Sequence, residues 1–409
     1  MENQSRAARM PVWRGVTGAI SLLPFGLPLL YTYPVTGSFK NELLRAATIL
    51  VAGILAGAVA IRQKLWQRLA PISQWMLGAL MLVMCASLLR ASNIGDSLTG
   101  RHGDYQGLLL QVAAIPIALV AIREAANKHY WLKAVSLMQL VCLLSVLVDI
   151  GHVDDGYRLS GLLLHDTGMG IYAAITLGLT LLLAEINEAR RVTTSKLYWL
   201  LLLIPSLATV LSASRLALLL VVFIFGLYAY QLPNMRKRLG TYALCLLFLT
   251  VVLTIFATST GRLTNAHKLN DGVGYRMTLY TWSLEHTDIL PVGVGSVDIA
   301  RQLRPLPADR IPQSLHDTLY VGYPLWYSHN QWIDVLIAYG ALGLGLVVGL
   351  FARSLRALFQ SLRLHKLHVE ALALATIALG ILLNVSFSTP SIELWPMFWM
   401  ALLIPRRDR

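Results

Sequence analysis

Residues 168–186 read GMGIYAAITLGLTLLLAEI, a run in which the one charged side chain, Glu185, stands near the end. A helix that crosses the hydrocarbon core of a membrane needs about 20 mostly apolar residues, so this run predicts a membrane-spanning helix. The whole chain agrees, because 56% of its 409 residues are hydrophobic and only 13% are charged. A soluble domain has about a quarter of its residues charged. The composition therefore excludes an ordinary soluble enzyme, a disordered chain and a fibrous chain.

Further apolar runs predict an all-α, polytopic integral membrane protein with about twelve transmembrane helices. The runs on either side of Ser212 are taken as two spans, because about 35 residues are too many for one. The chain is expected to form a single transmembrane domain over residues 1–409, with the first span kept as an uncleaved anchor. The predicted spans are residues 15–33, 41–61, 72–92, 107–122, 132–151, 168–186, 197–212, 215–231, 240–259, 329–352, 369–387 and 392–405.

The basic residues set the expected orientation. With the N-terminus in the cytoplasm, 22 of the 34 Lys and Arg residues fall in cytoplasmic segments, and only six fall in the short loops on the other side. Cytoplasmic loops of membrane proteins carry such an excess of Lys and Arg. Both termini are therefore expected to be cytoplasmic. The same asymmetry accounts for the net charge of +13 without nucleic acid as a partner.

One large loop, residues 260–328, is expected on the outer side between spans nine and ten. Structureless loops of this length are uncommon and usually functional. Within it, Leu279, Trp282 and His286 recur at spacings of three and four residues. This pattern predicts a short amphipathic helix over residues 275–286 that lies at the membrane surface. The stretch Pro291-Val-Gly-Val-Gly295 then predicts a turn.

Three ionisable residues near the outer interface are candidates for chemistry: Arg215 after Leu-Ser-Ala-Ser, Arg276 in the predicted surface helix, and His329 at the start of span ten. Charge near the hydrocarbon core is costly, which makes such residues functional candidates. Two guanidiniums suit a diphosphate, because arginine presents planar bidentate donors and keeps its charge. A neutral imidazole beside them can act as a general base. Together they predict transfer from a diphosphate-linked lipid donor to a hydroxyl.

Structural roles stay open for the same residues. An interfacial arginine also serves as an anchor to lipid phosphates, and a histidine at a span end serves as a polar cap. Asp149, Asp154, Asp155 and Asp166 flank a short outer loop. Their irregular spacing, with no Asp-x-Asp pair, favours a solvated loop over a metal site. We therefore predict neither a metal nor a cofactor.

Four short segments carry a family resemblance. Ser212-Ala-Ser-Arg215-Leu-Ala resembles a Ser-Arg-x-Ala turn, and Gly274-Tyr-Arg276 resembles a Gly-x-Arg helix in a large periplasmic loop. His329-Asn330, followed by Tyr339-Gly-Ala-Leu-Gly343, resembles a His-Asn motif with a glycine-containing helix after it. Tyr157-Arg158-Leu-Ser-Gly resembles the segment that enters span six. In this order, the four segments resemble the O-antigen ligase family, the lipid A-core:surface polymer ligases of Gram-negative inner membranes.

This resemblance implies a GT-C-like membrane glycosyltransferase of lipopolysaccharide biosynthesis whose active site faces the periplasm. Its donor is O-antigen polysaccharide on undecaprenyl diphosphate, and its acceptor is a hydroxyl of lipid A-core, both among inner-membrane lipids. His329 is expected to be the catalytic base, and Arg215 and Arg276 are expected to hold the diphosphate. Arg158 and Asn330 are expected to bind substrate. The resemblance also implies inversion at the anomeric carbon without a metal.

Other activities remain open. O-antigen polymerases and protein O-oligosaccharyltransferases belong to the same superfamily. One large loop where polymerases often have two, and a chain end at Arg409 close to the last span, favour a ligase. A flippase or transporter of lipid-linked sugars would keep the arginines but not need His329, and it should show paired broken helices in repeated halves. An envelope scaffold would use the large loop only to bind a partner.

The topology can be checked by cysteine labelling. Single cysteines at Ala308 and Ala7 should differ in their reaction with a membrane-impermeant thiol reagent on cells with a permeabilised outer membrane. We expect labelling at position 308 alone, because the basic residues place the large loop outside the cytoplasm. Labelling at position 7 without cell lysis would overturn the orientation.

Overall fold

The structure is a computed structural model, and the residues that it describes are all helical or in turns and connections, with no β-strand among them. The described residues are 2–30, 37–100, 107–149, 159, 161–163, 166–189, 197, 200–212, 214–232, 266–295, 299, 328–363, 369–388 and 394–404. The prediction of an all-α membrane protein is confirmed. Predicted span nine, residues 240–259, lies outside the described residues, so the count of twelve stays a prediction.

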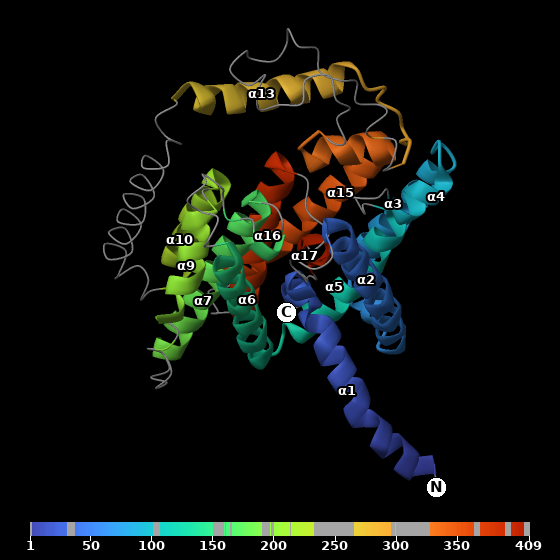
Figure 1. Cartoon of the computed structure of the whole chain (residues 1–409). Helices are drawn as coiled ribbons and strands as arrows, with labels where there is room; N and C mark the ends of the chain where they lie inside the picture. The colour runs from blue at the N-terminus through green and yellow to red at the C-terminus, as the bar shows by residue number, and fades with distance from the viewer. Residues whose placement is uncertain are drawn as a thin grey trace.

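The helices follow the predicted apolar runs. Figure 1 shows them as a bundle with one helix, α13, lying across its end. Their bounds are α1 (Glu2–Gly26), η1 (Leu27–Leu30), α2 (Gly37–Arg62), η2 (Leu65–Arg68), α3 (Pro71–Leu88), α4 (Ile94–Thr99), α5 (Leu108–Glu124), α6 (Lys128–Asp149), η4 (Gly161–Leu163), α7 (Asp166–Ala189), α9 (Leu203–Leu211), α10 (Arg215–Gln231), α13 (Ala266–Glu285), α15 (Gln331–Arg363), α16 (Val369–Phe387) and α17 (Trp395–Leu402).

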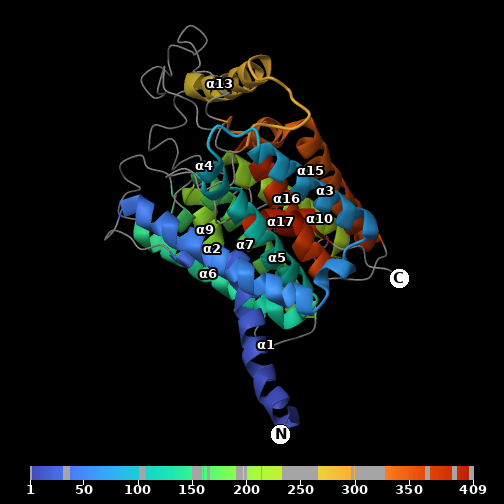
Figure 2. The ribbon, with the colours of Figure 1, turned by 90° about the vertical axis from the view of Figure 1, so that its right-hand side faces the viewer.

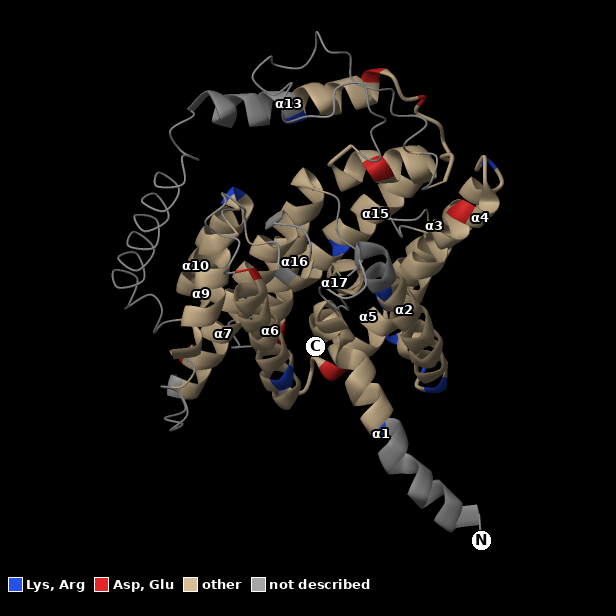
Figure 3. Ribbon diagram, in the orientation of Figure 1, with Lys and Arg blue, Asp and Glu red and all other residues tan. Residues whose placement is uncertain are grey.

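Six of these helices contain a segment long and apolar enough to cross a membrane. Two shorter apolar segments, Arg14–Leu30 and Arg215–Gln231, add to them. Figure 3 shows the reason for their apolar character: the helices of the bundle are mostly free of Lys, Arg, Asp and Glu, and the charged residues lie mainly toward the helix ends. Apolar walls of this kind face lipid at no cost in solvation, whereas charge inside hydrocarbon is expensive.

Helix α7, which contains the run quoted first, is the centre of the bundle. Its residues 167–186 are all buried by the rest of the protein. Two glycines of α7, Gly170 and Gly178, let side chains of neighbouring helices approach the α7 backbone closely, and Gly380 does the same for α16. A Cβ on Gly178 would meet Ile224 and Thr376 at 3.0 Å. Small residues allow this close packing between membrane helices. The apolar run therefore became a core helix with no face left for lipid.

The predicted break at Ser212 is confirmed. Helix α9 ends at Leu211, and α10 begins at Arg215. Ser214 caps the new helix, because its side chain accepts a hydrogen bond from the Ala217 N–H at 3.3 Å. Such a cap satisfies one of the backbone donors that a helix start leaves without a partner. The short Ser-rich turn thus sends α10 back alongside the bundle.

Predicted span ten differs from the structure. The sequence suggested one continuous helix over 329–352, but α15 breaks at Gly340, where φ is 75° and ψ is −176°. Only glycine adopts such a backbone readily. In Figure 1 the part of α15 before the break turns away from the part that follows it. The apolar pattern continues through the break, so hydropathy alone does not reveal it.

A loop segment fills the break in α15. The N–H groups of Ala341 and Leu342 donate to the carbonyls of Leu290 and Pro291, at 2.8 and 3.1 Å. In the other direction, Val294 and Gly295 donate to the carbonyls of Ile337 and Ala338, at 3.2 and 2.9 Å. These four bonds satisfy backbone groups that the break would leave unpaired in an apolar setting. The predicted turn at 291–295 is therefore held against the break in α15 by backbone hydrogen bonds.

Helix α13 contains the predicted surface helix and extends it toward the N-terminus, over 266–285 instead of 275–286. It lies across the end of the bundle in both ribbon views (Figures 1 and 2), opposite the end from which the N-terminal part of α1 projects. Leu279, on α13, is fully buried. Trp282 and His286 are half-buried and stacked, with ring centroids 3.6 Å apart. The predicted apolar face is thus the face that meets the protein.

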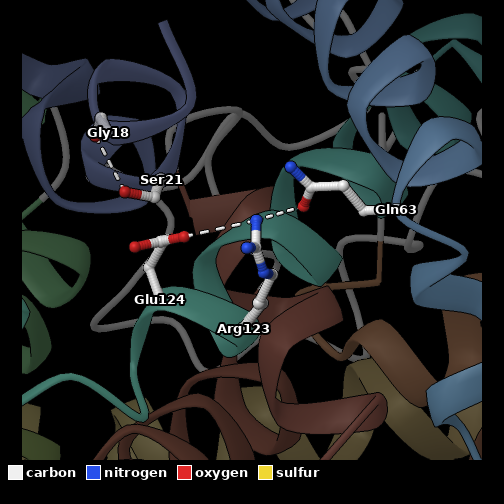
Figure 4. Close-up of polar contacts among 5 residues, drawn as sticks. All are labelled: Gly18, Ser21, Gln63, Arg123 and Glu124. Atoms are coloured by element: carbon white, nitrogen blue, oxygen red, sulfur yellow. Dashed lines mark hydrogen bonds and ion pairs between the residues drawn. The ribbon is translucent and has the colours of Figure 1, made fainter. Parts of the chain in front are cut away.

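The opposite end of the bundle is joined by a polar contact between α2 and α5. Arg123, at the end of α5, donates to the side-chain oxygen of Gln63 just after α2, and its guanidinium lies 3.5 Å from Glu124 (Figure 4). Both ionic partners are about two-thirds buried, with 31% and 29% of their side chains exposed. In the predicted orientation this is the cytoplasmic end.

Gly340→Ala tests the helix break. A Cβ on Gly340 would lie 2.5 Å from the Pro291 carbonyl oxygen, and φ of 75° is unfavourable for alanine. We expect the free energy of unfolding to fall by about 2 kcal/mol or more, measured as a lower Tm of the purified protein in detergent. Gly345→Ala is the matched control: it lies in the same helix with nothing within 4 Å of its Cβ position. A neutral Gly340→Ala would contradict the break.

Candidate functional site

The site lies where α13 meets the ends of α15 and α16. Arg276, on α13, donates from Nη1 to the carbonyl of Phe387 at 3.1 Å. Phe387 is the last residue of α16, and the last carbonyls of a helix lack partners within it. Arg276 therefore joins the surface helix to the end of a bundle helix, and its positive charge faces the negative end of the α16 dipole.

The turn before α15, residues 328–330, is held by hydrogen bonds to α15 and to the end of α16. Asn330 caps the helix, because its Oδ1 accepts from the Trp332 N–H at 3.0 Å. The amide of the same side chain donates to the Ser386 carbonyl at 3.1 Å, and the Trp332 indole N–H donates to Ser386 Oγ at 3.1 Å. These bonds fix the start of α15 against the end of α16, one residue from the carbonyl that Arg276 holds.

Tyr280 connects α13 to the same turn. Its hydroxyl donates to the His329 carbonyl at 3.3 Å. Burial raises the pKa of Tyr280 above its ordinary value, the nearby Arg276 charge opposes that rise, and the Asp334 carboxylate adds to it. The phenol thus stays protonated at neutral pH and remains a donor. Arg276 and Tyr280 lie four residues apart on one face of α13, so a single helix face contacts both α16 and the His329 turn.

His329 does not lie in the helix as expected, but in the turn before it. The sequence placed it in the first turn of span ten, whereas α15 begins at Gln331. His329 has a φ of 57°, a left-handed conformation that only one other non-glycine residue, Lys64, adopts among the described residues. Strained backbones of this kind gather at functional sites and persist where the surroundings hold them. His329 and Asn330 are both half-buried.

Arg215 lies at the same end of the bundle, on a neighbouring helix. Helices α10 and α16 run antiparallel, since Tyr228 bonds Thr376 at 2.7 Å and a Cβ on Gly380 would meet Leu220 at 3.2 Å. From the Leu220–Gly380 contact, Arg215 is about 8 Å toward the start of α10, at 1.5 Å per residue. By the same measure Phe387 is about 10 Å toward the end of α16. Arg215 and the carbonyl held by Arg276 therefore lie at similar depth.

Arg158 lies outside the described residues, but the next residue is placed. The Leu159 N–H donates to the Leu211 carbonyl at 3.1 Å, and Leu159 is fully buried. Leu211 ends α9, four residues before Arg215. The predicted segments around Arg158 and Arg215 are thus joined by a backbone hydrogen bond. Gly170, near the start of α7, packs on this turn: a Cβ there would lie 2.6 Å from Ser212 Oγ.

Sequence reasoning missed Arg45 as a residue of this region. Arg45 is 1% exposed, and its Nη2 donates to the Leu162 carbonyl at 2.6 Å. The Leu162 N–H donates to Ser145 Oγ of α6 at 3.1 Å. A charged group in an apolar core is retained only with compensating partners. The signal was present, because Arg45 stands four residues inside the predicted span 41–61, where a charge is unusual.

The structure thus brings Arg276, His329 and Asn330 into one cluster and places Arg215 at the same depth on an adjacent helix pair. Among the residues that the structure describes, no group of three or more His, Cys, Asp or Glu gathers as metal ligands would. Asp154 and Asp155 lie outside those residues. The arrangement offers cationic donors, a half-buried imidazole and an amide at the end of a membrane bundle. Such a set can bind a phosphate-bearing lipid and remove a proton.

The comparison with known families gives one match. The family model described as O-Antigen ligase matches residues 200–348, which contain Arg215, Arg276, His329 and Asn330. This match bears out the resemblance for the three short motifs that lie within it, and it supports the broader class, a membrane glycosyltransferase of the O-antigen ligase and polymerase superfamily. No curated protein and no solved structure matches the chain.

Arg45→Met should show that a buried cation holds the segment after Arg158. Methionine fills the space of the arginine stem but leaves the Leu162 carbonyl without this donor, which costs about 1–3 kcal/mol. We expect Tm of the purified protein to fall by several degrees. Arg68→Met, at an exposed position, is the control and should change Tm little. Equal Tm values for the two variants would contradict this role for Arg45.

Proposed function

We propose that the protein transfers O-antigen polysaccharide from undecaprenyl diphosphate to lipid A-core on the periplasmic side of the inner membrane. The observation that carries this proposal is the cluster at the end of α16: Arg276 bonds the Phe387 carbonyl, Tyr280 of the same helix bonds the His329 carbonyl, and all of these except Phe387 lie within the residues that match the O-antigen ligase model. The predicted orientation, with 22 basic residues in cytoplasmic segments, puts this cluster on the periplasmic side. Both substrates are lipid-anchored, so a site at the membrane surface suits them.

The diphosphate is proposed to bind between Arg215 and Arg276. Arg215 is the first residue of α10, and the positive end of a helix dipole favours an anion there. Arg276 offsets the negative end of α16, which would otherwise repel a diphosphate. Its fork has five N–H donors, so it can hold a phosphate oxygen beside the Phe387 carbonyl. Arg158, next to the bonded Leu159, is proposed as a further contact.

The reaction is proposed to be a single displacement at the anomeric carbon. His329 takes the proton from the acceptor hydroxyl as its oxygen forms a bond to that carbon. The bond from the carbon to the phosphate oxygen breaks on the opposite face, so the configuration inverts. Undecaprenyl diphosphate leaves with the electron pair, and the arginines stabilise the charge that develops on it. Asn330 orients the turn and contacts a sugar. Because arginines supply the positive charge, the proposal needs no metal ion.

Transfer by the purified protein is the direct test. Proteoliposomes containing undecaprenyl-diphosphate-linked O-antigen and lipid A-core should yield a high-mass product that carries both lipid A and polymer. Longer chains on undecaprenyl diphosphate, formed without lipid A-core, would indicate a polymerase instead. Movement of the donor between leaflets with no new covalent product would indicate a flippase.

Substitution of either arginine tests the diphosphate site. Arg215→Ala and Arg276→Ala should each lower the transfer rate by about 10²–10³-fold, because a charge-assisted contact made in the transition state is lost. Lysine at either position should restore activity only in part, since it keeps the charge without the fork geometry. Arg68→Ala, in η2 beyond the far end of α2, is the control for loss of one surface charge. An alanine variant with full activity would remove that residue from the site.

His329→Ala separates catalysis from binding. We expect transfer to be lost while the lipid-linked donor still binds, because the arginines remain. In the wild type, single-turnover transfer should fall as the pH drops below about 6.5, where histidine ordinarily takes up a proton, and donor affinity should change little. Loss of donor binding in the variant, with tighter donor binding by the wild type in acid, would instead make His329 a phosphate ligand.

A further inference from the structure

The turn that carries His329 is built around a buried carboxylate. Asp334 is 1% exposed, and its Oδ1 accepts from the Ser328 N–H at 2.8 Å. The Ser328 hydroxyl lies 2.8 Å from the same oxygen and 2.8 Å from the Asn330 carbonyl oxygen. The Asn330 N–H donates to that hydroxyl at 3.2 Å. One carboxylate oxygen therefore anchors the residue before His329, and a serine hydroxyl links it to the residue after.

The reason for this arrangement is the backbone of His329. A φ of 57° costs a residue with a side chain free energy, and such a conformation persists only when its flanks are held. Ser328 is held by Asp334, and Asn330 is held by Ser386 and by its cap on α15. The strained residue thus stands between two fixed neighbours. The strain sets the direction in which the imidazole leaves the backbone.

A carboxylate at this position is unusual for an apolar helix. Asp334 is in the first turn of α15, where the helix dipole stabilises a negative charge, and its own N–H donates to the Asn330 carbonyl at 3.0 Å. A helix cap alone needs no ion, since Asn330 already serves as the cap. The charged group is instead directed at the two polar atoms of Ser328. A charge-assisted hydrogen bond is about twice as strong as a neutral one.

We propose that Asp334 is a positioning residue for His329: through Ser328 it locks the strained turn that aims the imidazole at the acceptor hydroxyl. The proposal rests on the proposed glycosyl transfer for its effect on rate, but the locking of the turn can be measured by itself. Asp334 has no contact with substrate in this scheme. Its loss misplaces the base and leaves the arginines in place.

The test uses three variants of the full-length protein in proteoliposomes or detergent. Asp334→Ala removes the acceptor, Asp334→Asn keeps an oxygen at Oδ1, and Ser354→Ala is the control. Ser354 is also a buried polar residue of α15, whose hydroxyl donates to the Leu402 carbonyl at 2.7 Å, but it lies about seven helical turns after the His329 turn. Hydrogen exchange of the peptide containing residues 328–330 measures the turn. Single-turnover transfer and donor affinity, with undecaprenyl-diphosphate-linked O-antigen, measure its consequence.

Asp334→Ala should raise exchange of these amides by at least about tenfold and lower kcat by roughly tenfold to hundredfold, with donor affinity unchanged. Asp334→Asn should recover both losses only in part, because its neutral oxygen accepts a weaker hydrogen bond than a carboxylate does, and Ser354→Ala should show neither loss. Wild-type kcat in Asp334→Ala, or unchanged exchange, would overturn the proposal. The proposal would also be overturned if Asp334→Ala lowered yield and Tm only as much as Ser354→Ala does and left kcat unchanged. If the wild type transfers nothing, the proposed function fails, and exchange alone decides whether Asp334 locks the turn.

Discussion

The four backbone hydrogen bonds between residues 290–295 and the break in α15 are the constraint on which the site depends. A helix that breaks in an apolar bundle exposes N–H and C=O groups that nothing else there can satisfy. The loop that follows α13 supplies their partners, from Leu290 to Gly295. In doing so it ties one end of α13 to α15, and Arg276 and Tyr280 tie the same helix to α16 and the His329 turn. A surface helix with few buried side chains is thereby held by directional hydrogen bonds as well as by packing.

The buried charges of the chain serve the same assembly. Arg45 donates a hydrogen bond to the carbonyl of Leu162, which follows the Arg158 segment. Asp334 accepts a hydrogen bond from the N–H of Ser328, the residue before His329. In each case an ion that is 1% exposed bonds a backbone group of a segment that connects two membrane helices. Apolar packing is non-directional and holds helices well, but it cannot set the direction of a turn. Charge-assisted hydrogen bonds can, because they are directional and strong at low dielectric.

The sequence predicted the membrane helices, the break at Ser212 and the surface helix under Leu279, because these follow from length, charge alternation and spacing within a short window. It also predicted that Arg215, Arg276 and His329 share one depth. It could not predict the break at Gly340, since the apolar pattern runs through it and a glycine in an apolar helix is common. Nor could it pair Leu290 with Ala341, or Arg45 with Leu162 across 117 residues, because those contacts depend on tertiary packing. Arg45 and Asp334 were nonetheless visible as charges inside predicted spans.

The partner that Arg276 has in this structure explains how a pre-formed site can accept an anion. The guanidinium donates to a neutral carbonyl at the end of α16, so among the residues that the structure describes it is held in place by a bond that a substrate need not break. A phosphate oxygen forms a charge-assisted bond about twice as strong as that to a carbonyl, and the remaining donors of the fork can make it without moving α13. An arginine paired with a carboxylate would instead be neutralised before the diphosphate arrived. Holding cations on backbone carbonyls therefore keeps this end of the bundle positive and ordered at once.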